Sequence, residues 1–159
     1  MRKILTILIP IIICFVIGLT ASYFQQGAIK EWYPLLDKSN LTPPNIVFPI
    51  AWSIIYLCMG ISIGIIYLSH SQKKNELVKL FGLQLFFNFA WSILFFYLQN
   101  PLLGFIDILI LDICVTMYVV KSYPVKKVSS ALFWPYMIWI YFATYLNGYI
   151  LLNNSSFTL

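Results

Sequence analysis

Charged residues are scarce in this chain. Lys, Arg, Asp and Glu make up 9% of its 159 residues, whereas an average soluble domain carries about 25%. Hydrophobic residues reach 61%, and the mean hydropathy is +0.86. A chain with so few charged residues cannot form the polar surface that a soluble protein presents to water. The composition therefore excludes an ordinary soluble domain and predicts an integral membrane protein.

Metal-binding side chains are also scarce. The single histidine, His70, lies beside Lys73 in a polar connection, and the cysteines form no CxxC pair. Each cysteine lies in a different apolar run: Cys14, Cys58 and Cys114. We interpret the cysteines as small core hydrophobes. Because no group of residues has metal-ligand spacing, we expect no protein-ligated metal, no haem iron and no other cofactor.

Long uncharged runs account for most of the chain. A helix that crosses a hydrocarbon core about 30 Å thick needs about 20 mainly apolar residues. Five segments meet this length: residues 4–24, 46–68, 77–98, 102–120 and 131–152. They predict one all-α membrane domain over residues 1–159, a bundle of five transmembrane helices. Arg2 and Lys3 precede the first segment, as in a signal peptide, but its apolar stretch exceeds the usual length of about 7–15 residues.

The basic residues are divided unequally between the two sides of the predicted bundle. Eight lie at the amino terminus and around the second and fourth connections: Arg2, Lys3, Lys73, Lys74, Lys79, Lys121, Lys126 and Lys127. Only Lys30 and Lys38 lie on the opposite side. The positive-inside rule then predicts a cytoplasmic amino terminus and an external carboxyl terminus. The net charge of +5 does not indicate nucleic-acid binding, because these residues do not gather on one face.

The first connection, residues 25–45, is much longer than the others. It contains the aromatic and proline residues Trp32, Tyr33, Pro34, Pro43 and Pro44. A disordered linker is the alternative to an ordered loop, but disordered segments are poor in aromatic residues. Long ordered loops are commonly lids or binding loops. We therefore expect a lid on the external side of the bundle.

Three of the five segments carry polar and aromatic residues at helical spacing. Residues three, four and seven apart share a helix face, so these side chains should point into the bundle. The second segment presents Pro49, Trp52, Tyr56, Met59, Gly60 and Ile63; the third presents Gln84, Asn88, Trp91, Ser92 and Phe95; the fifth presents Tyr136, Trp139, Ala143, Leu146 and Asn147. The three faces predict an aromatic pocket beneath the first loop.

The depth of these residues supports a small-molecule site. At about 1.5 Å per residue, Trp52, Asn88 and Trp139 lie roughly 10, 15 and 20 Å below the loop side. Aromatic walls with a few polar groups are typical of such sites. Two alternatives remain open. Trp52 and Trp139 could belong to an interfacial belt. Asn88 could form an interhelical hydrogen bond without contacting a ligand, which is the role that we expect for Gln84.

Two further features of the spans have structural interpretations. Asp107 and Asp112 lie in the fourth segment about 140° apart around a helix, so they do not form a carboxylate pair, and we interpret both as structural. Gly60-xxx-Gly64 permits close helix approach. It predicts either a contact within one subunit or a dimer contact.

At these positions the sequence resembles the translocator protein family, also called the tryptophan-rich sensory or peripheral benzodiazepine receptor family. The resemblance covers nearly the whole chain. Its blocks are Trp32-Tyr33 with Leu36 and Lys38; Pro43-Pro44 with Trp52, Tyr56 and Met59-Gly60; Gln84, Asn88 and Trp91; Asp107; and Pro135-Tyr136, Trp139, Phe142-Ala143-Thr144 and Leu146-Asn147. The resemblance implies a bacterial cell-membrane protein, often a homodimer.

The resemblance also implies a ligand and a binding site. Members bind porphyrins and benzodiazepine- or isoquinoline-type ligands beneath the first loop. Combined with the helical faces, it implies ligand contacts from Tyr33, Pro43, Trp52, Tyr56, Asn88, Trp91, Ser92, Trp139, Ala143, Leu146 and Asn147. High-affinity sterol binding is not expected, because no Lys or Arg follows Tyr149.

Three functions are compatible with such a pocket. The first is a receptor or sensor for protoporphyrin-type tetrapyrroles, which would stack on Trp52 and Trp139. The second is an enzyme that degrades bound porphyrin with light and oxygen, with the same two tryptophans as its catalytic residues, since the pocket has no group for covalent catalysis. A tetrapyrrole or sterol transporter is third, because the chain lacks the inverted repeat common in secondary transporters.

Overall fold

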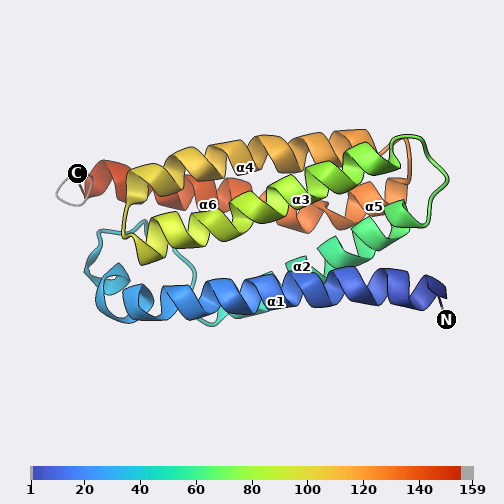
Figure 1. The fold of residues 1–159 in the computed structure, drawn as a ribbon. Coiled ribbons are helices and arrows are strands. Elements are labelled where there is room, and N and C mark those ends of the chain that lie inside the picture. The colour runs from blue at the N-terminus through green and yellow to red at the C-terminus, as the bar shows by residue number, and fades with distance from the viewer. Residues whose placement is uncertain (1, 155–159) are drawn as a thin grey trace.

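The computed structural model describes residues 2–154, and within this range every regular element is helical. Met1 and residues 155–159, which the single-domain prediction also covers, lie outside the described residues. Five long helices of the described residues lie side by side along the bundle (Figure 1). They are α1 Arg2–Glu31, α2 Val47–Tyr67, α3 Lys74–Trp91, α4 Pro101–Ser122 and α6 Trp134–Asn153, with the short α5 Lys127–Leu132 before α6.

Four of these helices are long and apolar enough to cross a membrane: α1, α2, α3 with its extension to Tyr97, and α4. The 20-residue α6 carries no charged side chain, but four tyrosines and two tryptophans lower its hydropathy. It lies along α4 in the same bundle (Figure 1). The protein is therefore an integral membrane protein, and its arrangement is consistent with the predicted five-helix bundle.

The first loop is shorter than the sequence indicates. α1 does not end near residue 24 but continues to Glu31, and a 3-10 turn η1, Tyr33–Leu35, follows it. The added turns are rich in residues that favour helices, and Lys30 in the last turn interacts favourably with the helix dipole. Ala28 and Trp32 are buried against Phe95 and Phe96. This packing stabilises the extension, so the irregular connection covers only residues 36–46.

Two predicted helices are interrupted. The helix expected over residues 77–98 is α3 followed by a π-helix, η2, Ser92–Tyr97, which is closed by a 2.8 Å hydrogen bond from the Leu98 N–H to the Ile93 carbonyl. The helix expected over residues 131–152 begins instead at Trp134. Phe133 separates it from α5, and Pro135 occupies its first turn, where proline is favoured. π-helical turns are frequent at functional sites.

Glycines join α1 to α2. A Cβ atom placed on Gly60 would lie 2.5 Å from the Ile11 Cα, and one on Gly64 would lie 3.0 Å from the Ile7 Cα. The Gly60-xxx-Gly64 motif thus makes a contact within one subunit, and α1 packs directly over both glycines. The alternative prediction, a dimer contact through this motif, is wrong because α1 occupies the surface.

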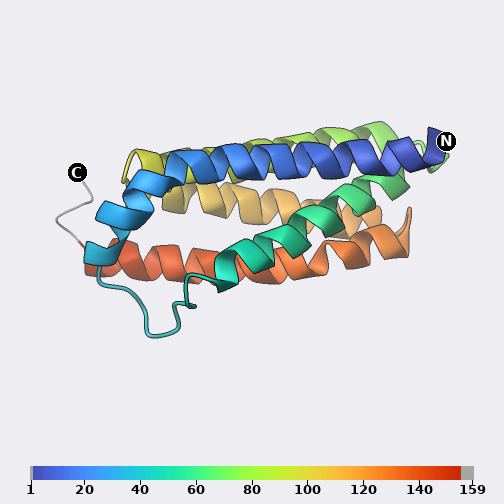
Figure 2. The ribbon, with the colours of Figure 1, turned by 90° about the horizontal axis from the view of Figure 1, so that it is seen from below.

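The two ends of α2 contact different helices. Its carboxyl-terminal half packs on α1 through Gly60, whereas near its start Phe48 contacts Trp139 of α6 with ring centroids 5.8 Å apart. α2 therefore crosses the bundle diagonally, and it diverges from α1 toward the loop end (Figure 2). The divergence opens space inside the bundle beneath the loop.

Candidate functional site

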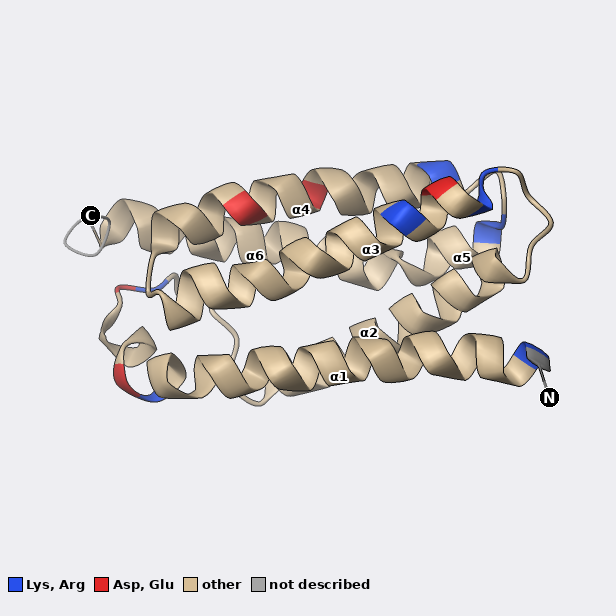
Figure 3. Cartoon of the chain, in the orientation of Figure 1, with Lys and Arg blue, Asp and Glu red and all other residues tan. Residues whose placement is uncertain are grey.

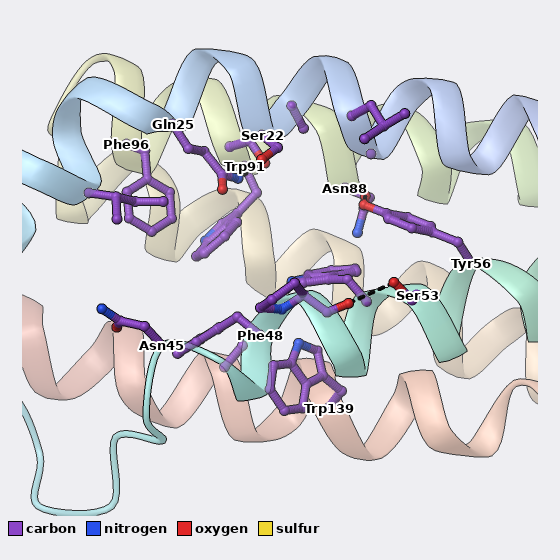
Figure 4. Close-up of a pocket in the computed structure, with 18 of the residues that line it drawn as sticks. Ser22, Gln25, Asn45, Phe48, Ser53, Tyr56, Asn88, Trp91, Phe96 and Trp139 are labelled. Carbon is purple, nitrogen blue, oxygen red and sulfur yellow. Dashed lines mark hydrogen bonds between the residues drawn. The ribbon is translucent and has the colours of Figure 1, made fainter.

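A cavity of about 350 Å³ lies in this space. α1, α2, α3, η2 and α6 form its walls, and η1 and the loop lie at its outer end (Figure 4). Its volume falls in the usual range of small-molecule pockets, about 300–1,000 Å³. The described lining is mostly aromatic and aliphatic, with a few amides and hydroxyls.

Tryptophan and tyrosine side chains form the wall near α2 and α6. The rings of Trp52 and Tyr56 stack with centroids 5.3 Å apart and an interplanar angle of 25°. The Trp139 ring lies edge-on to Trp52 at 6.5 Å and 78°. Such pairs add about 0.5–1.5 kcal/mol beyond burial. These tryptophans face the cavity rather than forming an interfacial belt.

Asn88 lies at the inner end of the cavity and joins three helices. Its Nδ2 donates to the Tyr136 hydroxyl at 3.0 Å, and the Tyr56 hydroxyl donates to its Oδ1 at 3.5 Å. The interhelical alternative for Asn88 is therefore present in the structure, although its side chain also lines the cavity. The fully buried amide of Gln84 has no hydrogen-bond partner among the described residues, so the bond expected for it is not formed. Its helix face packs into the hydrophobic core instead.

A second aromatic wall comes from the end of α3. Trp91 stacks on Phe95 at 5.2 Å and 11°, and its indole N–H donates to the Asn147 Oδ1 at 3.0 Å. The Asn147 Nδ2 in turn donates to the Pro101 carbonyl at 3.0 Å. These bonds fix the Trp91 ring, so Asn147 supports this wall from behind.

α1 contributes a wall that the sequence analysis did not predict. Ser22, Gln25 and Ile29 share one helix face and line the cavity. The Gln25 Nε2 donates to the Ser92 Oγ at 2.7 Å, which joins α1 to the first residue of the π-helix. The only indication of this wall in the sequence is the spacing of Ser22 and Gln25, two polar residues three apart at the end of an apolar run.

The first half of the loop is bound to the end of α6. The Asp37 N–H donates to the Asn154 Oδ1 at 2.8 Å, and the Asn154 Nδ2 donates to the Asp37 carbonyl at 3.0 Å. The hydroxyls of Ser39 and Tyr145 lie 3.0 Å apart. Lys38 lies over the Tyr33 ring at 4.8 Å. Burial raises the pKa of the Tyr33 phenol above its ordinary value.

Nine of the residues predicted from the sequence line the cavity: Tyr33, Trp52, Tyr56, Asn88, Trp91, Ser92, Trp139, Ala143 and Leu146. Two others, Pro43 and Asn147, are not among the lining residues that the structure describes. Pro43 lies in the loop, and Asn147 lies behind Trp91. The contribution of each lining residue to binding stays a prediction.

The two carboxylates of α4 lie outside this cavity. Asp107 and Asp112 are both buried, and the Thr144 hydroxyl of α6 donates to the Asp112 Oδ2 at 2.8 Å. This contact joins α4 to α6, in agreement with the structural interpretation of Asp112.

Membrane-crossing helices, an aromatic cavity inside the bundle and a loop bound to the end of α6 define a class of polytopic membrane protein with an internal cavity of small-molecule size. The profile of the TspO/MBR family matches residues 10–152, and the chain belongs to this family. It is 40% identical over 153 residues to the tryptophan-rich protein TspO of Archaeoglobus fulgidus, with 96% of this chain and 99% of the relative covered.

Two further relatives cover most of the chain. Identity to the tryptophan-rich protein TspO of Chlorobaculum tepidum is 36% over 156 residues, which cover 96% of this chain and 98% of the relative. Identity to the human translocator protein is 29% over 143 residues, which cover 88% and 82%.

Proposed function

We propose that this protein is a membrane receptor or sensor that binds porphyrin-type tetrapyrroles in the aromatic cavity. Flat benzodiazepine- and isoquinoline-type compounds are expected to occupy the same space. The observation that carries the proposal is the pair of cavity-facing tryptophans, Trp52 and Trp139, from two different helices around one 350 Å³ space. Their faces suit a planar aromatic ligand better than a flexible one.

The polar groups of the lining suggest how such a ligand is oriented. Gln25 and Asn45 lie toward the loop end of the cavity (Figure 4). Carboxylates of a porphyrin would accept hydrogen bonds at this end, while the macrocycle lies deeper between Trp52 and Trp91. Burying a charged group deep in the bundle is costly, which favours this orientation.

A pair of matched tryptophan variants tests the proposal. Trp52 lines the cavity, whereas Trp134 is half exposed on the outside of α6. In an equilibrium titration of purified protein with protoporphyrin, Trp52→Leu should weaken affinity by at least about 0.5–1.5 kcal/mol through lost stacking. Trp134→Leu should match wild type. Equal affinities for all three proteins, or no saturable binding by wild type, would contradict the proposal.

We further propose that the amino terminus faces the cytoplasm. Lys and Arg gather at the end of the bundle that holds the amino terminus, and few lie at the loop end (Figure 3). This asymmetry supports a cytoplasmic amino terminus and an external loop. A homodimer stays an expectation from the family, formed by some surface other than Gly60-xxx-Gly64.

Light-driven degradation of the bound porphyrin is a second candidate. The observation that favours it is the contact of Trp52 with both Trp139 and Tyr56, because indoles and phenols are oxidisable groups. Molecular oxygen would be the oxidant, and the excited porphyrin would start the reaction. The cavity would then bind the same ligand but also consume it.

A further inference from the structure

Several residues that line the cavity are exposed on the outside of the bundle. On α1, Leu19 is 70% exposed and Ile29 is 37% exposed, and Ser22 is exposed between them. On α2, Pro49 and Ser53 both line the cavity and are exposed. The cavity is partly open rather than enclosed. These exposed lining residues lie on α1 and α2, which indicates that it opens between these two helices.

The divergence of the two helices explains this opening. α1 and α2 are in close contact at Gly60 and Ile11, but the start of α2 lies against α6 (Figure 2). The Tyr56 ring packs against Gly18, where an added Cβ would lie 2.2 Å from it. This contact closes the inner end of the gap. Above it the gap is bordered by short side chains, Ser22 and Ser53, on opposite sides (Figure 4).

The opening lies within the membrane rather than above it. Ser53 is six residues into α2, and Ser22 is nine residues before the end of α1 at Glu31. At about 1.5 Å per residue these positions lie roughly 9 and 14 Å below the loop ends of their helices. Lys30 and Glu31 mark the interface above them. Acyl chains of the bilayer therefore border the opening.

We propose that ligands reach the cavity sideways from the bilayer, through this gap between α1 and α2, which we call the lateral opening. This inference rests on the proposed function and narrows its substrate class. The site selects planar ligands that dissolve in the membrane, such as dicarboxylic porphyrins. Porphyrins with many carboxylates are rejected, because charged groups pass through hydrocarbon only at high cost. The loop, held by Asn154, then covers the external end without acting as the passage.

Binding kinetics test the lateral opening. Protein in lipid nanodiscs is mixed with protoporphyrin-loaded vesicles, and the quenching of tryptophan fluorescence is followed in time. Ser22→Phe and Ser53→Phe place bulk in the opening and should slow association and dissociation together, by about tenfold or more. Val16→Phe and Ile54→Phe place the same aromatic ring at exposed positions of the same helices that do not line the cavity, and they should match wild type.

A loop variant tests the competing route. Asn154→Ala removes both hydrogen bonds that hold Asp37 and should leave the two rates unchanged. Faster exchange in Asn154→Ala, with no slowing in Ser22→Phe or Ser53→Phe, would overturn the lateral opening and assign the passage to the loop. The proposed function is judged separately from the route. Saturable equilibrium binding by wild type would support that function whichever route the kinetics favour, and no saturable binding would refute it.

Discussion

The Asn88 amide donates a 3.0 Å hydrogen bond to the hydroxyl of Tyr136, a side chain with no exposed surface. α3 and α6 are thereby joined at the inner end of the cavity. The same amide accepts from Tyr56, whose ring stacks on Trp52. A single side chain thus connects the packing of the bundle to the shape of the cavity.

Removing this connection should lower stability. Asn88→Ala leaves the Tyr136 hydroxyl without its partner, and interhelical hydrogen bonds in membrane proteins contribute about 0.6 kcal/mol on average and about 1.7 at most. We expect a loss of this size in the unfolding free energy measured in mixed micelles. Tyr136→Phe should cost a similar amount, and the double variant should cost little more than either. Fully additive losses would show that the bond contributes nothing.

The contact of Gly60 with α1 should tolerate no side chain. The Gly60→Leu side chain would overlap the Ile11 backbone, so overpacking should lower the free energy of unfolding by at least about 1–3 kcal/mol. Gly82→Leu is the control, since an added Cβ there meets nothing within 4 Å. Thermal denaturation of both variants in the same detergent measures the difference. Equal midpoints for Gly60→Leu and wild type would contradict the packing of α1 on α2.

Periodicity of the sequence predicted the walls from α2, α3 and α6, because polar and aromatic side chains repeat there at helical spacing. It could not predict the wall from α1. Ser22 and Gln25 are only two polar residues at the end of a long apolar run. Gln25 lies on a helix because α1 continues to Glu31, an extension that Ala28 and Trp32 stabilise by packing with Phe95 and Phe96. The π-helix that begins at Ser92 could not be predicted either, because it differs from an α-helix in its backbone hydrogen bonds and leaves no distinctive residue pattern in the sequence. The lateral opening depends on the crossing of two helices, which is a tertiary property.

The orientation of the chain can be tested by cysteine labelling. In a background without the native cysteines, Asn40→Cys in the exposed part of the loop should react with a membrane-impermeant maleimide in intact cells. Lys127→Cys, exposed at the start of α5, should react only after lysis. The expectation follows from the excess of Lys and Arg at the amino-terminal end. The reverse pattern would invert the topology.

Degradation of porphyrin, if it occurs, should require light, oxygen and the cavity tryptophans. Phenylalanine keeps an aromatic face for stacking but is a poor electron donor, so Trp52→Phe and Trp139→Phe should retain much of the affinity and lose the reaction. The porphyrin absorbance of each variant is followed under fixed illumination beside its binding curve. Equal decay in all proteins would mean that free porphyrin bleaches, and the enzymatic alternative would be rejected.

Filling the cavity tests the central claim most directly. Ala143 lines the cavity on α6, whereas Ala131 is exposed on α5. Both are changed to Phe, and protoporphyrin binding is titrated at equilibrium with the folded, monodisperse proteins. Ala143→Phe should reduce affinity by more than about tenfold, which is about 1.4 kcal/mol, because its ring occupies the space of the ligand. Ala131→Phe should bind like wild type. Undiminished binding by folded Ala143→Phe would show that the ligand binds elsewhere and would contradict the account.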